Sequence, residues 1–234
     1  MNKPQFFLSL LLISLIIACV PSKESEQNLS KKSAYDPDKQ PIEQAEFLGC
    51  GSSFDMQKHL IDFSKDIERK KITYNSEPLS DCSGMFIRLL QSLEKECNQH
   101  TFLDPKKTRS SRGIAKWYYD QGNFVMIKDA SKIGHLIQAG AVLFFGRSGK
   151  KYDQLNIDLL TSSQGIEHVG TVTKVVKDGA GNVVSYEMFH GRSTGKIAQR
   201  TNYHDLHPKR KELPPFGNWN QQLVGIAYVV RPKK

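Results

Sequence analysis

The segment from residue 167 to residue 191 constrains the fold more than any other part of the sequence. Its two halves, "EHVGTVTKVVK" (167–177) and "NVVSYEMFHG" (182–191), are rich in β-branched and aromatic residues. Between them, "DGAGN" (178–182) has the composition of a tight turn. Two such runs joined by a short turn predict an antiparallel β-hairpin. The fold must therefore contain an antiparallel sheet.

The hairpin also predicts where its two histidines lie. If it closes symmetrically about Ala180, residue 190 pairs with residue 170. Because side chains alternate between the two faces of a strand, His168 and His190 then share one face as diagonal neighbours, with Cα atoms about 7–8 Å apart. A shift of one residue in the pairing would put them on opposite faces.

Helices are expected before the strands in the folded part. Apolar residues at near-helical spacing predict an amphipathic helix over 54–72, and a second helix is expected to begin after Asp81 and to run to about Asn98. The segment 113–123 fits either a helix or a strand. Short apolar or valine-rich runs predict further strands at 140–146 and 224–231. Helices followed by strands indicate an α+β fold.

The start of the second helix carries a cysteine in an unusual setting. In "LSDCSGMFIRLL" (79–90), Asp81 is a favourable N-cap, which puts Cys82 in the first helical turn. The positive end of the helix dipole and the unpaired N–H groups there favour thiolate over thiol, and the same N–H groups can stabilise an oxyanion. We expect the small residues Ser83 and Gly84 to leave the sulfur accessible.

Together these residues predict nucleophilic chemistry. Cys82 would be the nucleophile, His168 the base that takes its proton, and His190 the residue that orients the base. A zinc site built from the same three residues is the alternative, but it would need a fourth ligand or water, and no closely spaced pair of metal ligands is present. We therefore expect no metal and no cofactor.

The remaining cysteines bear on the redox state. In a continuous helix Cys97 would lie about 22 Å from Cys82, at 1.5 Å per residue, so these two cannot form a disulfide. The pair that leaves Cys82 free is Cys50 with Cys97. The sequence favours two free thiols over that bond.

The N-terminal region predicts export. Residues 1–18 contain an apolar run too short to span a bilayer comfortably, in the layout of a secretory signal, and "SLIIACVP" resembles the lipobox of bacterial lipoproteins, in which Cys19 would carry lipid. The alternatives are an ordinary signal peptide and an N-terminal anchor. Residues 19–46 are polar and predict a flexible tether, and 47–234 have the length of one domain.

The charge limits the partners. A formal net charge of +9 permits nucleic acid, but the sequence carries no nucleic-acid recognition motif, and an exported lipoprotein would instead meet lipid headgroups, teichoic acids and the carboxylates of peptidoglycan. We expect no nucleic-acid partner. The densest basic cluster, "HPKRKELPP" (207–215), predicts a solvated loop, with a specific binding patch as the alternative.

Five motifs in order resemble the NlpC family of cell-wall cysteine peptidases, which have a papain-like fold. They are "SDCSGMF", "RSSRGIA", "IQAGAVLFFG", "EHVGTV" and "MFHGRSTG", and the resemblance extends from about residue 56 to residue 195. It implies a Cys82, His168, His190 triad that cleaves peptidoglycan stem peptides through an acyl-enzyme, often between γ-D-glutamate and a diamino acid.

The chain departs from the family pattern near the cysteine. It keeps Tyr74 ahead of Cys82 but lacks the Gly-Gly pair common there, and it lacks the aspartate common before the apolar strand. Tyr74 would support the oxyanion or the substrate, or only pack. Two rival functions remain: the same nucleophile acting on another acyl substrate, as an amidase or acyltransferase, and a non-catalytic peptidoglycan-binding lipoprotein. A cell-envelope location, anchored to the membrane through Cys19, is expected in each case.

Overall fold

The computed structural model describes residues 49–231. The predicted signal (1–18), the lipid site at Cys19 and the tether (19–46) lie outside this range. Within it, no helix has the length and apolar character needed to cross a bilayer.

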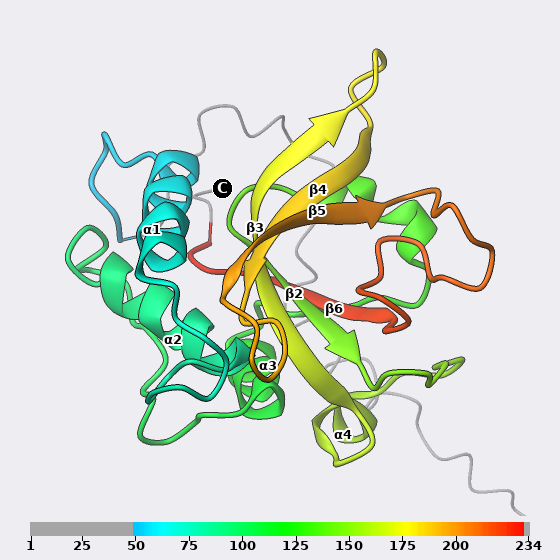
Figure 1. Ribbon diagram of the computed structural model, residues 1–234, viewed down its shortest axis with the longest axis horizontal. Helices are drawn as coiled ribbons and strands as arrows, with labels where there is room; N and C mark the ends of the chain where they lie inside the picture. The colour runs from blue at the N-terminus through cyan, green and yellow to red at the C-terminus, as the bar shows by residue number, and fades with distance from the viewer. Residues whose placement is uncertain (1–48, 232–234) are drawn as a thin grey trace, which may run out of the picture. The chain divides into compact units, whose positions relative to one another are not determined.

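The centre of the fold is a six-stranded antiparallel sheet with the strand order β1-β6-β2-β3-β4-β5 (Figure 1). Four of its strands lie where the sequence predicts them. β1 and β5 were not predicted, because β1 is very short and "QRTNYHD" in β5 is too polar to give a strand signal. The strands are β1 (Val125–Met126), β2 (Ala141–Gly146), β3 (Ile166–Lys177), β4 (Val183–His190), β5 (Gln199–Asp205) and β6 (Leu223–Tyr228).

The helices lie mainly on one side of the sheet (Figure 1). They are α1 (Met56–Lys70), α2 (Cys82–Leu93), α3 (Ser111–Asp120) and α4 (Ile157–Thr161), with two short 3-10 turns, Ala130–Lys132 and Gly134–Leu136. The ambiguous segment 113–123 is thus largely helical, and the Ser110 side chain caps it by accepting from the N–H of Gly113 at 3.1 Å. The α+β class is confirmed.

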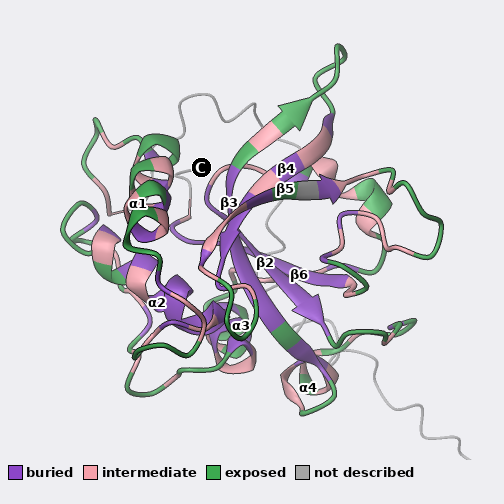
Figure 2. Cartoon of the chain, viewed as in Figure 1, coloured by how far each residue is buried: buried purple, intermediate pink, exposed green. Residues whose placement is uncertain are grey.

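Each face of the sheet has its own core. Along β2, Val142 and Phe144 pack with the helices, whereas Leu143 and Phe145 pack on the opposite face against residues of the 3-10 turns and the loop before β6. All of β2 and β6 is buried, as is most of β3 near its start (Figure 2). A strand covered on both faces needs a continuous apolar run, which explains the sequence "AVLFFG".

The hairpin pairing follows the prediction at the histidine end. Thr171 pairs with Phe189 and Val172 with Met188, which is the register of a hairpin symmetric about Ala180. The register then shifts by one residue at Thr173 and shifts back near the turn, where Lys177 pairs with Val183. Two compensating irregularities therefore leave the histidines on one face.

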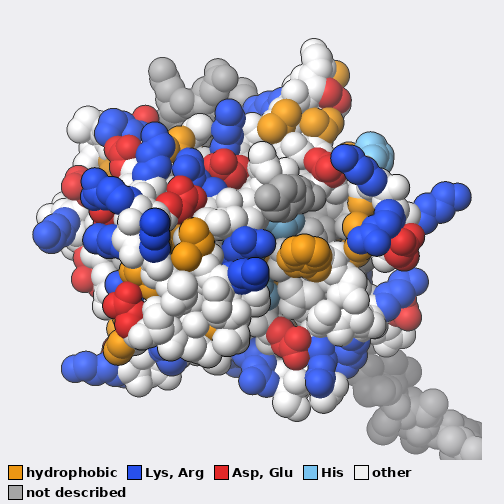
Figure 3. Space-filling model, viewed as in Figure 1, with side chains coloured by type: hydrophobic (Ala, Val, Ile, Leu, Met, Phe, Trp, Pro, Cys, Tyr) orange, Lys and Arg blue, Asp and Glu red, His pale blue; other side chains and the backbone are white. Residues whose placement is uncertain are grey.

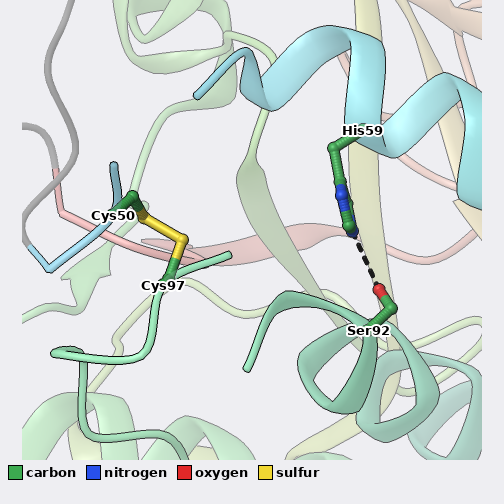
Figure 4. The surroundings of a disulfide bond; sticks show 4 residues. All are labelled: Cys50, His59, Ser92 and Cys97. Atoms are coloured by element: carbon green, nitrogen blue, oxygen red, sulfur yellow. Dashed lines mark hydrogen bonds between the residues drawn. A yellow bond between two sulfur atoms is a disulfide. The ribbon is translucent and has the colours of Figure 1, made fainter. Parts of the chain in front are cut away.

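The prediction of two free thiols is wrong. α2 ends at Leu93 rather than near Asn98, so the chain turns back and Cys97 forms a disulfide with Cys50 (Figure 4). The turn pairs with the segment around Cys50, since the N–H of Gly51 donates to the Glu96 carbonyl at 3.3 Å. Nearby, the ring Nε2 of His59 in α1 lies 2.9 Å from the Ser92 hydroxyl in α2 (Figure 4).

Candidate active site

The N-terminus of α2 is held by a polar cluster around Asp81. One carboxylate oxygen of Asp81 accepts from the backbone N–H of Gly84 at 2.7 Å and from the Ser83 hydroxyl at 3.1 Å. A guanidinium nitrogen of Arg109 lies 2.9 Å from the same oxygen and donates to the Ser83 hydroxyl at 2.6 Å. The predicted N-cap is therefore confirmed, and Arg109 partly neutralises it.

Cys82 is the first residue of α2 and its side chain is buried. Its sulfur lies 3.5 Å from the hydroxyl of Ser111, which is the first residue of α3. Two helix N-termini therefore meet at this thiol, and both present backbone N–H groups that have no carbonyl partner within their helix.

The environment of the thiol differs from the expectation in two respects. Burial raises the pKa of the Cys82 thiol, and the negative Asp81 adds to this effect, whereas Ser111 and nearby backbone N–H groups oppose it. Burial therefore outweighs these hydrogen bonds, and the thiol form is favoured. Ser83 and Gly84 do not open the site either, because both are buried and Gly84 packs against the backbone of Leu79.

The two histidines form a hydrogen-bonded pair. His168 Nε2 lies 2.7 Å from His190 Nδ1, and the rings meet edge to face with centroids 4.8 Å apart. Burial lowers the pKa of His168 to about 3 and, together with the neighbouring His168, holds the pKa of His190 well below its usual range. Both imidazoles are neutral at pH 7 and retain an acceptor nitrogen.

Cys82 lies next to the strands that carry this pair. Its sulfur is 3.9 Å from the carbonyl oxygen of Glu167 and faces the N–H of Val169, so it flanks the backbone of residue 168. At the end of β4, Gly191 packs on the start of α2 so closely that a Cβ there would lie 2.8 Å from the backbone nitrogen of Cys82. Among the described residues, the thiol makes no hydrogen bond to either imidazole.

Tyr74 lies within electrostatic reach of the thiol. Burial raises the pKa of Tyr74 to about 12, and the negative charge of Asp81, and of Cys82 once it ionises, adds to the shift. Its backbone N–H donates to the Lys196 carbonyl at 2.9 Å, which ties this segment to the chain just after β4. The phenol is therefore protonated at neutral pH and can act as a hydrogen-bond donor.

A cavity of about 200 Å³ opens beside His190. Its buried side is formed by His190, Thr201 and His204, and the loop between β5 and β6 forms most of its rim. Figure 3 shows histidine atoms near the middle of this face with Lys and Arg side chains around them. Arg192 and Arg210 line the cavity.

The basic loop 207–215 is thus only partly the solvated loop that the sequence predicts. Lys209 and Lys211 are exposed, whereas Pro208, Leu213 and Pro214 line the cavity. The rim of the cavity also carries Trp219, which is 73% exposed.

Sequence reasoning missed several residues of the site. Arg109 and Ser111 lie in the "RSSRGIA" motif, which marked a resemblance but gave no role to either residue. Thr201 and His204 lie in β5, whose polar sequence gave no strand signal. Between residues 49 and 231, no group of three His, Cys, Asp or Glu side chains is placed to hold a metal ion.

Comparison of the chain with family models, with curated proteins and with solved structures found no match.

Proposed function

We propose that this protein is a cysteine peptidase of the NlpC type, with a papain-like fold, that cleaves peptidoglycan stem peptides. The observation that carries the proposal is the buried His168–His190 pair beside a cysteine at a helix N-terminus. A nucleophile, a base and a group that orients the base are the parts that thiol-dependent acyl transfer requires.

The chemistry starts from a neutral thiol. Rotation about the Cα–Cβ bond of Cys82 moves the sulfur from Ser111 toward His168, and such contacts often tighten only when substrate is bound. The sulfur attacks the peptide carbonyl as a ring nitrogen of His168 takes the thiol proton. The C–N bond then breaks, and the imidazolium gives that proton to the leaving amine. Water, deprotonated by His168, hydrolyses the thioester and restores the thiol.

The negative charge on the oxygen of the tetrahedral intermediate is stabilised by hydrogen-bond donors. The backbone N–H groups at the start of α2 point toward this region, and the protonated hydroxyl of Tyr74 is a second candidate. Tyr74 would thus support the oxyanion rather than act as a base, since its pKa of about 12 keeps it protonated.

The cavity beside His190 favours an anionic substrate. In the part of the chain that the structure describes, Arg192 forms no ion pair, and Arg210 approaches only Glu212 at 3.9 Å, near the surface. Stem peptides carry free carboxylates that such guanidinium groups bind well. The exposed ring of Trp219 offers an apolar surface next to them. These features favour a carboxylate-bearing stem peptide, and the resemblance to the NlpC family adds the γ-D-glutamyl–diamino acid bond as the proposed site of cleavage.

The decisive experiment uses purified muropeptides of several chemotypes. Wild-type protein and the Cys82→Ser variant are incubated with each, and the products are identified by mass spectrometry. We expect cleavage by the wild type alone. No cleavage of any chemotype, with the variant and the wild type equally folded, would overturn the peptidase proposal. Labelling of Cys82 by a thiol-reactive acyl probe without cleavage would instead favour another acyl substrate.

The membrane anchor is a separate part of the proposal. A lipid on Cys19 would hold the enzyme at the cell envelope, where its substrate lies. Growth of the expressing bacterium with labelled palmitate should label the wild type and not the Cys19→Ala variant. Equal labelling of both proteins, or of neither, would contradict lipidation of Cys19.

A further inference from the structure

The hydrogen bonds of the histidine pair continue into the fold beyond His190. His190 Nε2 lies 3.0 Å from the hydroxyl oxygen of Thr201, and that oxygen lies 3.1 Å from His204 Nε2. The other ring nitrogen of His204, Nδ1, lies 2.8 Å from the carbonyl oxygen of Gly217. His168, His190, Thr201 and His204 are each at most 6% exposed, so these bonds are largely shielded from solvent, although the cavity reaches one side of them.

This chain of hydrogen bonds has a fixed direction because the Gly217 carbonyl oxygen at its far end can only accept. A carbonyl oxygen has no proton, so His204 Nδ1 must carry the proton that binds Gly217. A neutral His204 then has its lone pair at Nε2, and the hydroxyl of Thr201 donates to it. Burial lowers the pKa of His204, which favours this neutral form. The other acceptor near that hydroxyl, the Met188 carbonyl, is farther away at 3.5 Å.

The same logic extends to the catalytic pair. Since the Thr201 proton is used toward His204, its oxygen accepts from the protonated Nε2 of His190. The lone pair of His190 is then at Nδ1, where it accepts from the protonated Nε2 of His168. This leaves the lone pair of His168 at Nδ1.

We propose that Thr201 and His204 are positioning residues that fix the tautomers of both histidines, so that Nδ1 of His168 is the nitrogen that takes the thiol proton. The tautomer assignment rests on the hydrogen bonds and on a neutral His204, and only its catalytic meaning rests on the proposed peptidase function. No proton moves along the chain during the reaction: when Nδ1 of His168 gains the thiol proton, its Nε2–H still donates to His190.

The tautomers are measurable without any substrate. In full-length protein labelled with ¹⁵N in histidine, long-range ¹H–¹⁵N correlation spectra at pH 7.5 distinguish protonated from unprotonated ring nitrogens. We expect His168 and His190 to be protonated at Nε2 and His204 at Nδ1. A wild-type spectrum with His168 protonated at Nδ1 would overturn the proposal, whatever any variant does.

A matched pair of variants at Thr201 tests the positioning role. Thr201→Val removes the hydroxyl and keeps the shape, whereas Thr201→Ser keeps the hydroxyl. We expect Val to mix the tautomers of His190 and His168 and to lower kcat about 10–100-fold with little change in KM, as for other groups that orient a functional side chain, and Ser to restore both. Wild-type tautomers and activity in a folded Val variant would overturn the proposal.

Variants at His204 test the same proposal independently, in case the Thr201→Val variant does not fold. His204→Gln retains an acceptor for the Thr201 hydroxyl, whereas His204→Leu does not, and both remove the same ring. We expect wild-type tautomers of His168 in the Gln variant and mixed tautomers in the Leu variant, and the same spectrum in both would overturn the role of His204. If the tautomers are as proposed but no muropeptide is cleaved, the function fails and the tautomer assignment stands.

Discussion

At the scale of single residues, the candidate nucleophile Cys82 is a buried thiol, and the polar groups around it would stabilise its thiolate. The Ser111 hydroxyl and nearby backbone N–H groups favour a thiolate at Cys82, but loss of water favours the thiol and has the larger effect. The nearby imidazoles are held neutral by the same loss of water. The resting site is therefore a neutral thiol next to neutral histidines, rather than a preformed ion pair.

This neutral resting state predicts a specific pH dependence of thiol reactivity. Because the pKa of Cys82 is raised, its thiolate fraction is small at pH 7 and grows as the pH rises through the raised value. Alkylation by iodoacetamide should therefore be slow at pH 6–7 and should still be rising above about pH 9, where the alkylation of an ordinary cysteine levels off.

The rate is best followed by mass spectrometry in a Cys19→Ala background. Cys50 and Cys97 are joined in a disulfide, so Cys82 is then the free thiol that reacts. A rate that is high and constant from pH 5 to pH 8 would show a thiolate–imidazolium pair and contradict the burial argument.

At the scale of elements, the site depends on a contact between the end of β4 and the start of α2. Gly191 follows His190 directly and lies against the backbone of Asp81 and Cys82, where a Cβ would come within 2.7 Å of a backbone carbon. A side chain there must displace one element from the other. This contact fixes the distance between the helix that carries Cys82 and the strand that carries His190.

Gly191→Ala tests this contact. Overpacking at a buried backbone contact should lower the free energy of unfolding by about 1–3 kcal/mol, and the displacement should lower cleavage more than the loss of stability explains. Urea denaturation and muropeptide assays at a temperature where the variant is folded measure the two effects.

Gly179→Ala in the hairpin turn is the matched control, since a Cβ there meets no atom within 4 Å. It should leave stability and activity unchanged. Equal effects of the two substitutions would show that the loss at Gly191 is not caused by its contact with α2.

At the scale of the whole molecule, the net charge of +9 is less informative than where single charges lie. Most Lys and Arg side chains are exposed and spread over the surface seen in Figure 3. Arg192 differs because it lines the cavity beside His190 and lowers the pKa of that histidine. A cation in this position is stabilised when a carboxylate of the substrate binds near it.

Arg192→Gln should therefore raise KM for a carboxylate-bearing stem peptide about 10–100-fold, since hydrogen bonds to charged groups contribute about 1.5–3 kcal/mol and about 1.4 kcal/mol is tenfold. Steady-state kinetics with the peptide and with its amidated form measure the effect, which should shrink for the amide.

The control is Lys211→Gln, which removes the same charge from an exposed position that does not line the cavity. It should leave KM within about 2-fold at 0.15 M salt, because exposed charges are screened there. A rise in KM for Lys211→Gln as large as that for Arg192→Gln would point to the overall charge instead of the cavity.

The sequence by itself determined the local structure around the candidate site. The hairpin pattern predicted that His168 and His190 share a face of the sheet. This prediction needs only the position of the turn and the alternation of side chains along a strand. Asp81 predicted the start of α2 for a similarly local reason, since a cap satisfies N–H groups a few residues away.

The tertiary structure alone decided what surrounds these residues. Whether Cys82 is a thiol or a thiolate depends on how many atoms exclude water from it, and whether Cys97 meets Cys50 depends on where α2 ends. The positioning of Thr201 and His204 behind His190 arises from strand pairing across the sheet. Burial and long-range pairing are properties of the packed chain, so short sequence patterns could not predict them.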